Sequence, residues 1–294
     1  MYIFDRIVKS SEIAKMFELE LVGFDKDITR IATTEFCSDD SIGWIKNSLF
    51  FDKITKGVLV CKKTDFDLIE KDCSLTYLIT TRSPRLVFSK IINHFYTNAS
   101  ASDFENKVNY FRNNNALKIG ENVFIASNVE IGVNTVIHHN VSIYANTVIG
   151  SNCVIQSNTS IGTEGLGLDL DEDINLLVKF PQLGGVILED YVEVGPNSTI
   201  RRAALNNTII QRGTKIGALC NIGHNSVIGE NCILTCNVVT SGSSKIGNNV
   251  FLGVGSILKQ GVIVENNAIV GQGSVVVKNI PEGETWIGNP AKKM

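Results

Sequence analysis

The chain has 294 residues, which is enough for two domains and a sizeable core. Its formal net charge of −3 gives no electrostatic footprint for nucleic acid, so no nucleic-acid partner is expected. No charged and apolar leader opens the sequence, and no apolar run approaches the roughly eighteen residues of a membrane span. We therefore expect a cytoplasmic protein without a transmembrane segment. The cysteines show no paired short spacings, so neither disulfides nor a metal site are predicted.

Residues 1–100 carry the pattern of a small α/β domain. Residues 10–17 predict a capped amphipathic helix, and residues 84–95 place apolar side chains at helical spacing. Four short runs have the composition of strands: 19–22, 28–33, 57–61 and 75–80. Eleven of the fourteen Phe lie in the first 112 residues, where a globular core has room for large rings.

A change of composition over residues 101–118 predicts a linker. Ser102-Asp103-Phe104-Glu105 has the pattern that caps a short helix, and Asn113-Asn114-Asn115 is expected to end it. The second domain is predicted to cover residues 119–294.

In this second domain an aliphatic residue recurs every six positions, beginning with Ile119, Ile125, Ile131 and Ile137. A helix needs apolar steps of three and four, and a strand alternates by two, so neither fits. The period predicts a chain wound into three-sided coils whose aliphatic residues point to the axis. The fourth residue after each aliphatic one is small or β-branched; Cys153, Cys220 and Cys232 occupy this slot, where Cys acts as a small buried apolar group.

The repeat is interrupted by a predicted loop insertion at residues 163–185. It contains Gly165-Leu166-Gly167 and the run from Lys179 to Gly185. A long excursion from a regular solenoid is usually functional or disordered. Its acidic residues are expected to form a solvated loop tip rather than a metal site: Asp169, Asp171, Glu172 and Asp173.

Two histidines stand at the third position of a hexad, which faces outward from the coils. They are His224, in Ile222-Gly223-His224-Asn225, and His139, in Ile137-His138-His139-Asn140. Neutral imidazole is a suitable proton acceptor near pH 7. Either residue also fits a plain surface position on a coil.

The hexads resemble those of left-handed parallel β-helix acyltransferases over roughly the last 175 residues. The order of the N-terminal domain is similar to that of the UDP-acylglucosamine N-acyltransferases of the lipid A pathway. Similar pieces are Glu12-Ile13-Ala14, Leu21-Val22-Gly23, Ser41-Ile42-Gly43-Trp44-Ile45, Gly57-Val58-Leu59-Val60 and Ser83-Pro84-Arg85-Leu86. The resemblance implies a mainly β fold, a left-handed parallel β-helix with a small N-terminal α/β domain. It also implies a homotrimer with active sites shared between subunits.

The resemblance assigns nucleotide binding to Trp44, Asn47 and Phe50. Two aromatic faces stack a flat base, while an amide hydrogen-bonds its polar edge. The alternative is that both rings are ordinary core aromatics, and three residues do not distinguish uracil from thymine.

The resemblance also implies that His224, with Asn225 beside it, is the catalytic base that removes the proton of an attacking amine. His139 remains a second candidate. Lys179, Pro181 and Gln182 match the family's Lys-x-Pro-Gln substrate loop, which reaches toward a neighbouring subunit near the active site.

The chain departs from the family's motifs at several positions. Arg201 stands where the family has Asp, in Ile200-Arg201-Arg202-Ala203, and Gly217 and Gly261 replace an acidic residue and a second His. The ending from Trp286 to Met294 resembles sugar N-acetyltransferases that use acetyl-CoA. These features favour an N-acetyltransferase that modifies a UDP- or dTDP-linked amino sugar for a bacterial surface glycan such as O-antigen.

Acyl-CoA is then expected as a co-substrate along the coil groove, with no bound cofactor. Lys259, Lys278 and Lys292 are candidate partners of its phosphates, and the Gly242 backbone N–H is a candidate oxyanion donor. Two alternatives stay open. One is the lipid A pathway N-acyltransferase, which uses a hydroxyacyl carrier protein, and the other is a non-catalytic scaffold that binds a nucleotide sugar.

Overall fold

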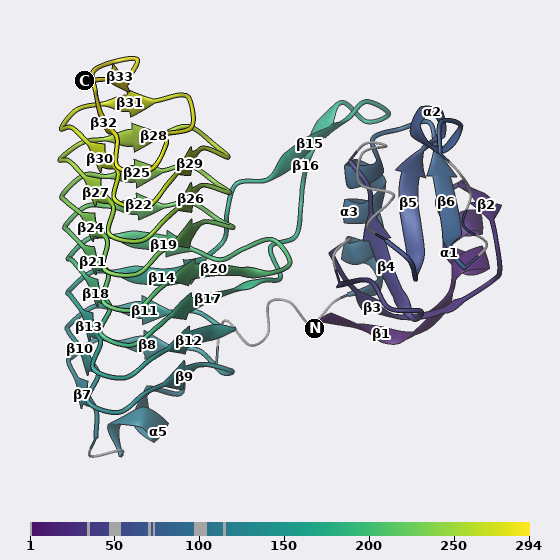
Figure 1. Ribbon diagram of the computed structural model, residues 1–294. Helices are drawn as coiled ribbons and strands as arrows, with labels where there is room; N and C mark the ends of the chain where they lie inside the picture. The colour runs from purple at the N-terminus through teal and green to yellow at the C-terminus, as the bar shows by residue number, and fades with distance from the viewer. Residues whose placement is uncertain are drawn as a thin grey trace. The chain divides into compact units, whose positions relative to one another are not determined.

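The computed structural model describes residues 2–33, 36–46, 54–69, 72, 74–96, 105–113 and 116–294. The chain divides into two compact units (Figure 1). Unit 1 holds residues 1–99 and 166–181, and unit 2 holds residues 100–165 and 182–294. The middle of the predicted insertion is therefore part of the N-terminal unit. None of the helices in the described residues is long and apolar enough to span a membrane.

Unit 1 is built on a six-stranded mixed sheet of order β1-β3-β4-β5-β6-β2. Its strands are β1 (Tyr2–Lys9), β2 (Glu20–Val22), β3 (Asp27–Ile31), β4 (Ser41–Trp44), β5 (Val58–Lys62) and β6 (Thr76–Thr80). Its helices are α1 (Ser10–Met16), α2 (Lys63–Phe66) and α3 (Pro84–Phe95). Strands β3 to β6 are parallel, and β1 and β2 close the two edges in antiparallel pairing. The two main helices and four strands predicted from the sequence are confirmed, whereas β1 and β4 were not predicted.

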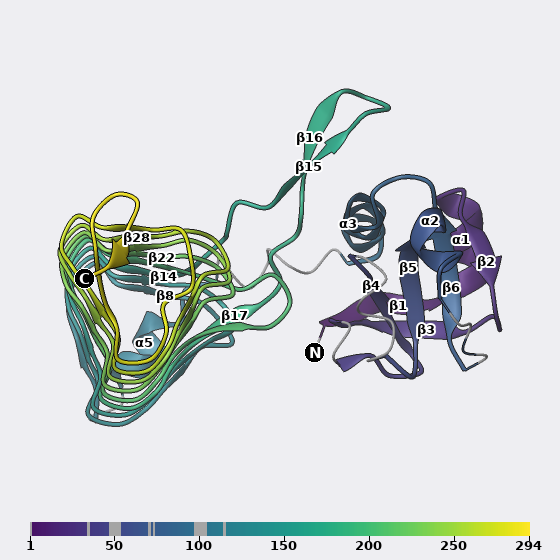
Figure 2. The same cartoon turned by 45° about the horizontal axis from the view of Figure 1, so that its top comes forward.

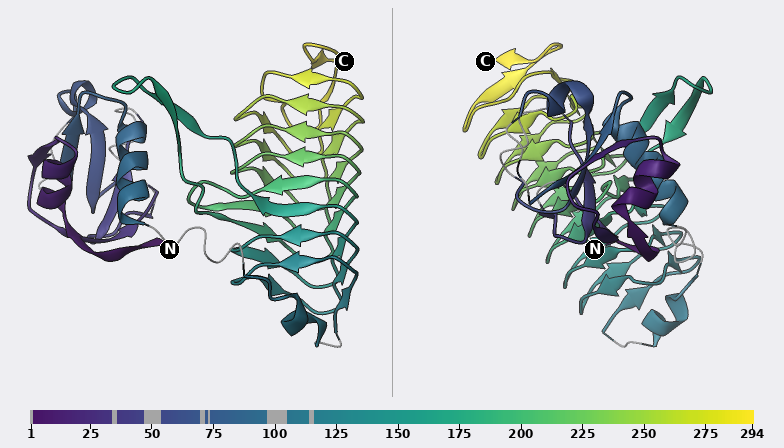
Figure 3. Two further views of the ribbon diagram at one scale, coloured as in Figure 1. Left: turned by 180° about the vertical axis from the view of Figure 1, so that it is seen from behind. Right: turned by 90° about the vertical axis from the view of Figure 1, so that its right-hand side faces the viewer.

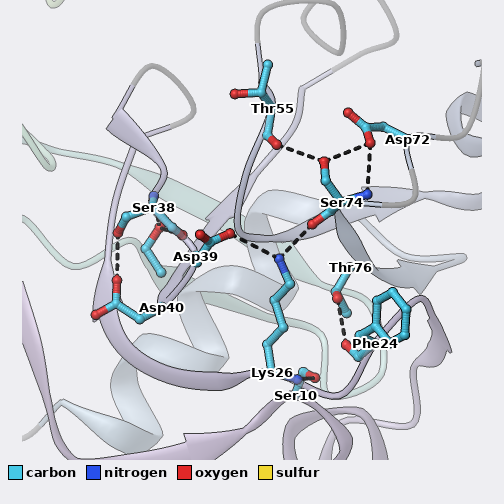
Figure 4. Close-up of polar contacts among 11 residues, drawn as sticks. Ser10, Phe24, Lys26, Ser38, Asp39, Asp40, Thr55, Asp72, Ser74 and Thr76 are labelled. Atoms are coloured by element: carbon cyan, nitrogen blue, oxygen red, sulfur yellow. Dashed lines mark hydrogen bonds and ion pairs between the residues drawn. The ribbon is translucent and has the colours of Figure 1, made fainter.

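Polar side chains from distant positions fix the loop around the start of α1. The predicted side-chain cap of α1 comes from a distant residue, since Asp25 accepts hydrogen bonds from both the backbone N–H (2.9 Å) and the hydroxyl (2.8 Å) of Ser11. The backbone N–H of Ser11 holds the pKa of the Asp25 carboxyl below its usual value. Lys26 then donates to the carbonyl of Ser74 at 2.7 Å and pairs with Asp39 (Figure 4).

A β-hairpin from the insertion completes unit 1 by packing on α3. It consists of β15 (Leu168–Asp171) and β16 (Leu176–Lys179), paired antiparallel. Three ion pairs join it to the helix region: Arg82–Asp173 at 3.1 Å, Arg85–Asp169 at 2.9 Å and Lys90–Asp171 at 2.5 Å. The expectation of a solvated acidic loop tip is therefore wrong for Asp169 and Asp171, whose carboxylates are largely buried in these pairs, with Asp171 only 1% exposed. Glu172 and Asp173 are exposed, as expected.

Unit 2 is a parallel β-helix with a triangular outline when viewed down its coils (Figure 2). The first coil sheet contains β7 (Lys118–Ile119), β10 (Val136–Ile137), β13 (Val154–Ile155), β18 (Glu193–Val194), β21 (Lys215–Ile216), β24 (Ile233–Leu234), β27 (Phe251–Leu252), β30 (Ile269–Val270), β32 (Thr285–Ile287) and β33 (Lys292–Lys293). The second contains β8 (Phe124–Ile125), β11 (Ser142–Ile143), β14 (Ser160–Thr163), β19 (Thr199–Arg201), β22 (Asn221–Ile222), β25 (Val239–Thr240), β28 (Ile257–Leu258) and β31 (Val275–Val276). The third contains β9 (Glu130–Ile131), β12 (Thr147–Ile149), β17 (Gly185–Leu188), β20 (Asn207–Ile210), β23 (Val227–Ile228), β26 (Lys245–Ile246) and β29 (Ile263–Val264). The predicted mainly β solenoid is confirmed.

The hexads explain this geometry. The recurring aliphatic residues are almost all buried and form one continuous core along the axis, and successive coils lie in register along each sheet (Figure 3). At most corners the chain turns sharply at a residue with positive φ, which is usually Asn because Asn tolerates the left-handed region. Cys153, Cys220 and Cys232 are buried in the small slot as predicted. We call the turns from the first to the second sheet, from the second to the third and from the third to the first the first, second and third corners.

A short helix covers the N-terminal end of this core. In α5 (Val108–Arg112), Val108 and Phe111 are buried against the first coils, which is how solenoids protect a terminal repeat. The predicted cap over residues 102–105 lies mostly outside the described residues. The contact that the structure shows is with Asn106, whose Oδ1 accepts from the N–H of Val108 at 3.0 Å and of Ile125 at 3.2 Å.

Candidate active site

His224 lies at the second corner of unit 2, directly after β22, and is half-buried. Glycines enclose its imidazole on two sides. A Cβ added to Gly165 would lie 2.8 Å from Cδ2 of the ring, and one added to Gly242 would lie 2.6 Å from Nε2. The ring therefore occupies a slot that exists only because both neighbours lack side chains.

The hydrogen bonds around Asn225 determine the imidazole tautomer. Oδ1 of Asn225 accepts from the backbone N–H of Ala204 at 3.1 Å, so this atom is the amide oxygen and not the nitrogen. The same Oδ1 lies 2.9 Å from Nδ1 of His224, and an oxygen acceptor requires a proton on Nδ1. Neutral His224 then carries its lone pair on Nε2, which has no hydrogen-bond partner among the described residues. This nitrogen is able to take a proton.

Asn225 is itself held by the turn. Its φ is +60°, the left-handed conformation that Asn adopts at most of the coil corners, and its backbone N–H donates to the Thr208 hydroxyl at 2.9 Å. The acceptor that orients the imidazole is therefore a fixed part of the coil.

Gly242 provides a free backbone N–H one coil beyond His224. At the equivalent position of the third corner, the N–H of Glu230 donates to Oδ1 of Asn248 at 2.9 Å, and the N–H of Asn248 donates to Oδ1 of Asn266 at 2.8 Å. In both cases the corner N–H is hydrogen-bonded by the Asn side chain at the same position of the next coil. His224 has a glycine in that place, so its N–H stays free, and the Gly242 N–H likewise has no partner within the described ranges. Two open donors consequently lie beside the imidazole.

His139 has the opposite arrangement. Its Nδ1 accepts from the backbone N–H of Glu121 at 2.9 Å, so the neutral ring carries its proton on Nε2. The lone pair of His139 is occupied, and the residue is exposed at the first corner rather than the second. The two histidines that look equivalent in the sequence therefore differ in the one property that a base requires.

Two of the predicted lysines share the corner of His224. Register pairing places β25, β28 and β31 successively beyond β22, so Lys259 and Lys278 lie two and three coils past His224. Lys292 lies instead in β33 at the end of the first sheet. The structure thus groups His224, Asn225, Gly242, Lys259 and Lys278 along one edge and leaves Lys292 outside this group.

Comparison with known proteins identifies the family. The family model for bacterial transferase hexapeptide repeats (six repeats) matches residues 243–278. A UDP-3-O-acylglucosamine N-acyltransferase from Campylobacter lari is 39% identical over 255 residues, covering 81% of this chain and 78% of that protein. The chain belongs to the UDP-3-O-acylglucosamine N-acyltransferase family.

Other relatives of the family match in part. The enzyme of the same name from Methylobacterium nodulans is 37% identical over 115 residues, so the alignment spans 39% of this chain and only 33% of that protein. Among solved structures, a UDP-N-acetylglucosamine acyltransferase from Francisella novicida superposes with a TM-score of 0.54 at 23% identity, covering 62% of this chain and 66% of that one. That likeness concerns the fold alone.

The other residues that the family resemblance implied are not among the contacts of His224 that the structure shows. Trp44 ends β4 in unit 1 and is half-buried, whereas Asn47 and Phe50 lie outside the described residues. Lys179 ends β16 and Pro181 follows it in unit 1, and Gln182 begins the return to unit 2, where it is buried.

Two residues of the site were not predicted from the sequence. Gly165 was noted only as part of the insertion, and Ala204 belongs to the four residues added to the hexad after Arg202. An irregularity in an otherwise strict repeat was the available signal for both.

In the described ranges no group of three or more His, Cys, Asp or Glu residues has an arrangement that could hold a metal ion.

Proposed function

We propose that this protein is an N-acyltransferase that transfers an acyl group from a thioester to the amine of a UDP-linked acylglucosamine. The observation that carries the proposal is the open lone pair on Nε2 of His224 beside the free Gly242 amide, in a chain whose Campylobacter lari relative bears that enzymatic name. The relatives support the lipid A pathway reaction, which was our alternative hypothesis, better than an acetyl-CoA enzyme of O-antigen synthesis.

The reaction needs one proton acceptor and one oxyanion donor. As the sugar amine attacks the thioester carbonyl, a C–N bond forms and Nε2 of His224 takes the amine proton. The carbonyl oxygen gains negative charge, which the Gly242 N–H stabilises from its fixed position in the coil. Collapse of the intermediate breaks the C–S bond, and the departing thiolate receives the proton from the imidazolium. Asn225 holds the ring throughout, and its oxygen stabilises the N–H of the imidazolium.

Trp44, Asn47 and Phe50 remain our candidates for holding the nucleobase, by the stacking and edge contacts described above. Lys179, Pro181 and Gln182 remain candidates for the loop that contacts the sugar. Trp44 supports this role by its position at the end of β4, where it is only partly covered.

The donor carries a phosphorylated arm whether it is acyl-CoA or an acyl carrier protein. Lys259 and Lys278 suit its phosphate because they are exposed and lie about 10 and 14 Å from His224 along the coils, at roughly 4.8 Å per coil. Lys292 is a weaker candidate, since it lies on the first sheet.

We also propose the homotrimer on the basis of an uncharged exposed surface. Ile233, Phe251 and Ile269 are adjacent on the outer face of the first sheet and are 47%, 39% and 44% exposed. Val254 at the first corner and Ile257 on the second sheet extend this surface onto the adjoining face. A surface that wraps one corner meets two neighbours, as a closed three-membered ring requires. Phe251→Lys is expected to convert trimer to monomer in sedimentation velocity, whereas a wild-type monomer would contradict this assembly.

The direct test of function is an acyl-transfer assay with purified protein. UDP-3-O-acylglucosamine is offered as acceptor, with hydroxyacyl carrier protein, hydroxyacyl-CoA and acetyl-CoA as separate donors. We expect amide formation with the carrier protein. Turnover with acetyl-CoA alone would support the O-antigen-type N-acetyltransferase instead, and binding of UDP-sugar without thioester consumption would leave a non-catalytic scaffold.

A further inference from the structure

Arg201 is a cationic residue one coil before His224 that the proposed mechanism leaves unused. It ends β19, one coil before His224 on the second sheet. Its Nε donates to Oδ1 of Asn221 at 3.4 Å, and its NH1 donates to the carbonyl of Glu164 at 3.3 Å. Asn221 is in the strand that leads to His224, and Glu164 precedes the glycine that packs on the imidazole. Arg201 therefore contacts both chain segments that lead to the imidazole site, residues 164–165 and residues 221–224.

The guanidinium of Arg201 still has open donors. Of its five N–H groups, the two contacts above use two, both are long, and within the described part of the chain no carboxylate pairs with it. Other arginines of the protein do have acidic partners, for example Arg30 with Asp40 at 3.0 Å and Arg85 with Asp169 at 2.9 Å. The neighbouring Arg202 is buried and its Nε donates to the Gly162 carbonyl, so its guanidinium is not presented to solvent.

We infer that Arg201 binds the phosphate attached to the sugar of the nucleotide-sugar substrate. The inference rests on the proposed function. A guanidinium fork matches phosphate oxygens and forms charge-assisted hydrogen bonds with them. No charged residue occupies the outer face of the second sheet next to Arg201, since the adjacent positions are Thr199 and Asn221. The nearest acidic residue in the neighbouring coil is Glu164, which is exposed and contacts Arg201 through its backbone carbonyl.

Distance along the coils selects the acceptor phosphate over the donor phosphate. Arg201 lies one coil, about 5 Å, from His224. An amine on the second sugar carbon is only a few bonds from the phosphate on the first, so a base that reaches the amine has that phosphate close by. A thioester is separated from its phosphate by a long arm, which corresponds better to Lys259 and Lys278 on the other side of His224. The two kinds of phosphate are thus assigned to opposite ends of the site.

Calorimetric binding of UDP and of uridine isolates this contact from turnover. With Arg201→Gln we expect the affinity for UDP to fall about ten- to a hundredfold, the scale of a lost charge-assisted hydrogen bond, while uridine affinity is unchanged. Arg201→Lys keeps the charge but not the fork, so it should recover part of the loss. Arg212→Gln is the matched control because Arg212 is an exposed arginine at the third corner, stacked on Tyr191; it should change neither affinity.

Kinetics distinguish the two phosphate sources. Arg201→Gln should raise KM for the UDP-sugar and leave KM for the donor unchanged, and Lys278→Gln should do the reverse. Unchanged UDP affinity in Arg201→Gln overturns the inference even where acyl transfer proceeds, and a raised donor KM in that variant assigns Arg201 to the donor instead, which also overturns it. Selective loss of UDP affinity in a protein that transfers no acyl group would support the phosphate site while the proposed function fails.

Discussion

Asn225 accepts a hydrogen bond from the side chain of the residue before it, with 2.9 Å between its Oδ1 and Nδ1 of His224. Asn225 has the positive φ that is usual at the coil corners, and its side-chain amide faces the ring of the preceding residue. The turn that closes the coil therefore also fixes the protonation of the imidazole. A structural requirement of the solenoid and a chemical requirement of the site are met by the same residue.

Asn225→Gly removes this acceptor while keeping a residue that tolerates positive φ. We expect kcat to fall about ten- to a hundredfold because the imidazole loses its orientation, with little change in the midpoint of thermal unfolding. The matched control is Asn237→Gly, since Asn237 turns another exposed corner with φ of +59°. Equal activity in both variants would show that Asn225 serves the turn alone.

Gly242→Ala introduces a methyl group where the imidazole lies. Its Cβ would be 2.6 Å from Nε2 of His224 and 2.7 Å from Cε1, so the ring must move. We expect at least a hundredfold loss of kcat/KM without unfolding. Gly255→Asn is the control because nothing lies within 4 Å of its added Cβ and Asn tolerates its φ of +69°. Wild-type rates for Gly242→Ala would mean that the imidazole is not confined as the structure shows.

Acid should loosen the hairpin of unit 1. The hydrogen bond from Lys90 holds the pKa of the Asp171 carboxyl below its usual 3.8. A depressed carboxyl pKa stabilises the folded state above the usual value, and this contribution is lost as pH falls through the lower folded value. Amide hydrogen exchange of residues 168–179, corrected for intrinsic rates, should therefore show protection at pH 5 that declines progressively as the pH falls below the usual carboxyl pKa of 3.8.

Asp171→Asn should reduce the protection of the hairpin at pH 5 and remove most of its dependence on pH, because the amide cannot ionise. Asp173→Asn is the comparison, since its pair with Arg82 is more exposed and contributes little. Protection of the hairpin in Asp171→Asn equal to that of the wild type at pH 5 would exclude the Lys90 pair as the contact that holds the hairpin.

Thiol labelling should separate the buried cysteines from the exposed one. Burial raises the pKa of the Cys61 thiol to about 12, and burial also raises the pKa of Cys153, Cys220 and Cys232. At pH 8 we expect iodoacetamide to modify Cys236 readily in the native protein, because its side chain is exposed, and these four only after unfolding. Peptide mass spectrometry with and without guanidinium reads this out. Rapid native labelling of Cys220 or Cys232 would contradict the packed coil.

The strict hexads were sufficient to predict the coils because one inward residue and one small residue per side determine the path of the chain. Helices α1 and α3 of unit 1 were equally visible from their spacing, whereas the single turn α2 was not predicted. The docking of the β15–β16 hairpin on α3 was not, because it depends on ion pairs between residues about 80 positions apart. Composition alone makes the carboxylates of this hairpin look solvated.

The candidate histidines were predictable from the sequence, but the feature that distinguishes His224 from His139 was not. His224 and His139 have the same hexad position and the same following Asn, so the sequence ranks them only by resemblance. What separates them is which ring nitrogen is already hydrogen-bonded, and this depends on residues in other coils. The contribution of Arg201 was hidden for the same reason, since it appears in the sequence only as a departure from a motif.

The comparison of His224→Ala with His139→Ala in steady-state amide formation tests the central claim most directly. UDP-3-O-acylglucosamine and the best donor are used at saturating and limiting concentrations, and the folded state of both variants is verified by thermal unfolding. We predict a loss of about 10²–10⁴ in kcat/KM for His224→Ala and a wild-type value for His139→Ala. Full turnover by folded His224→Ala, or an equal loss in both variants, would contradict the account.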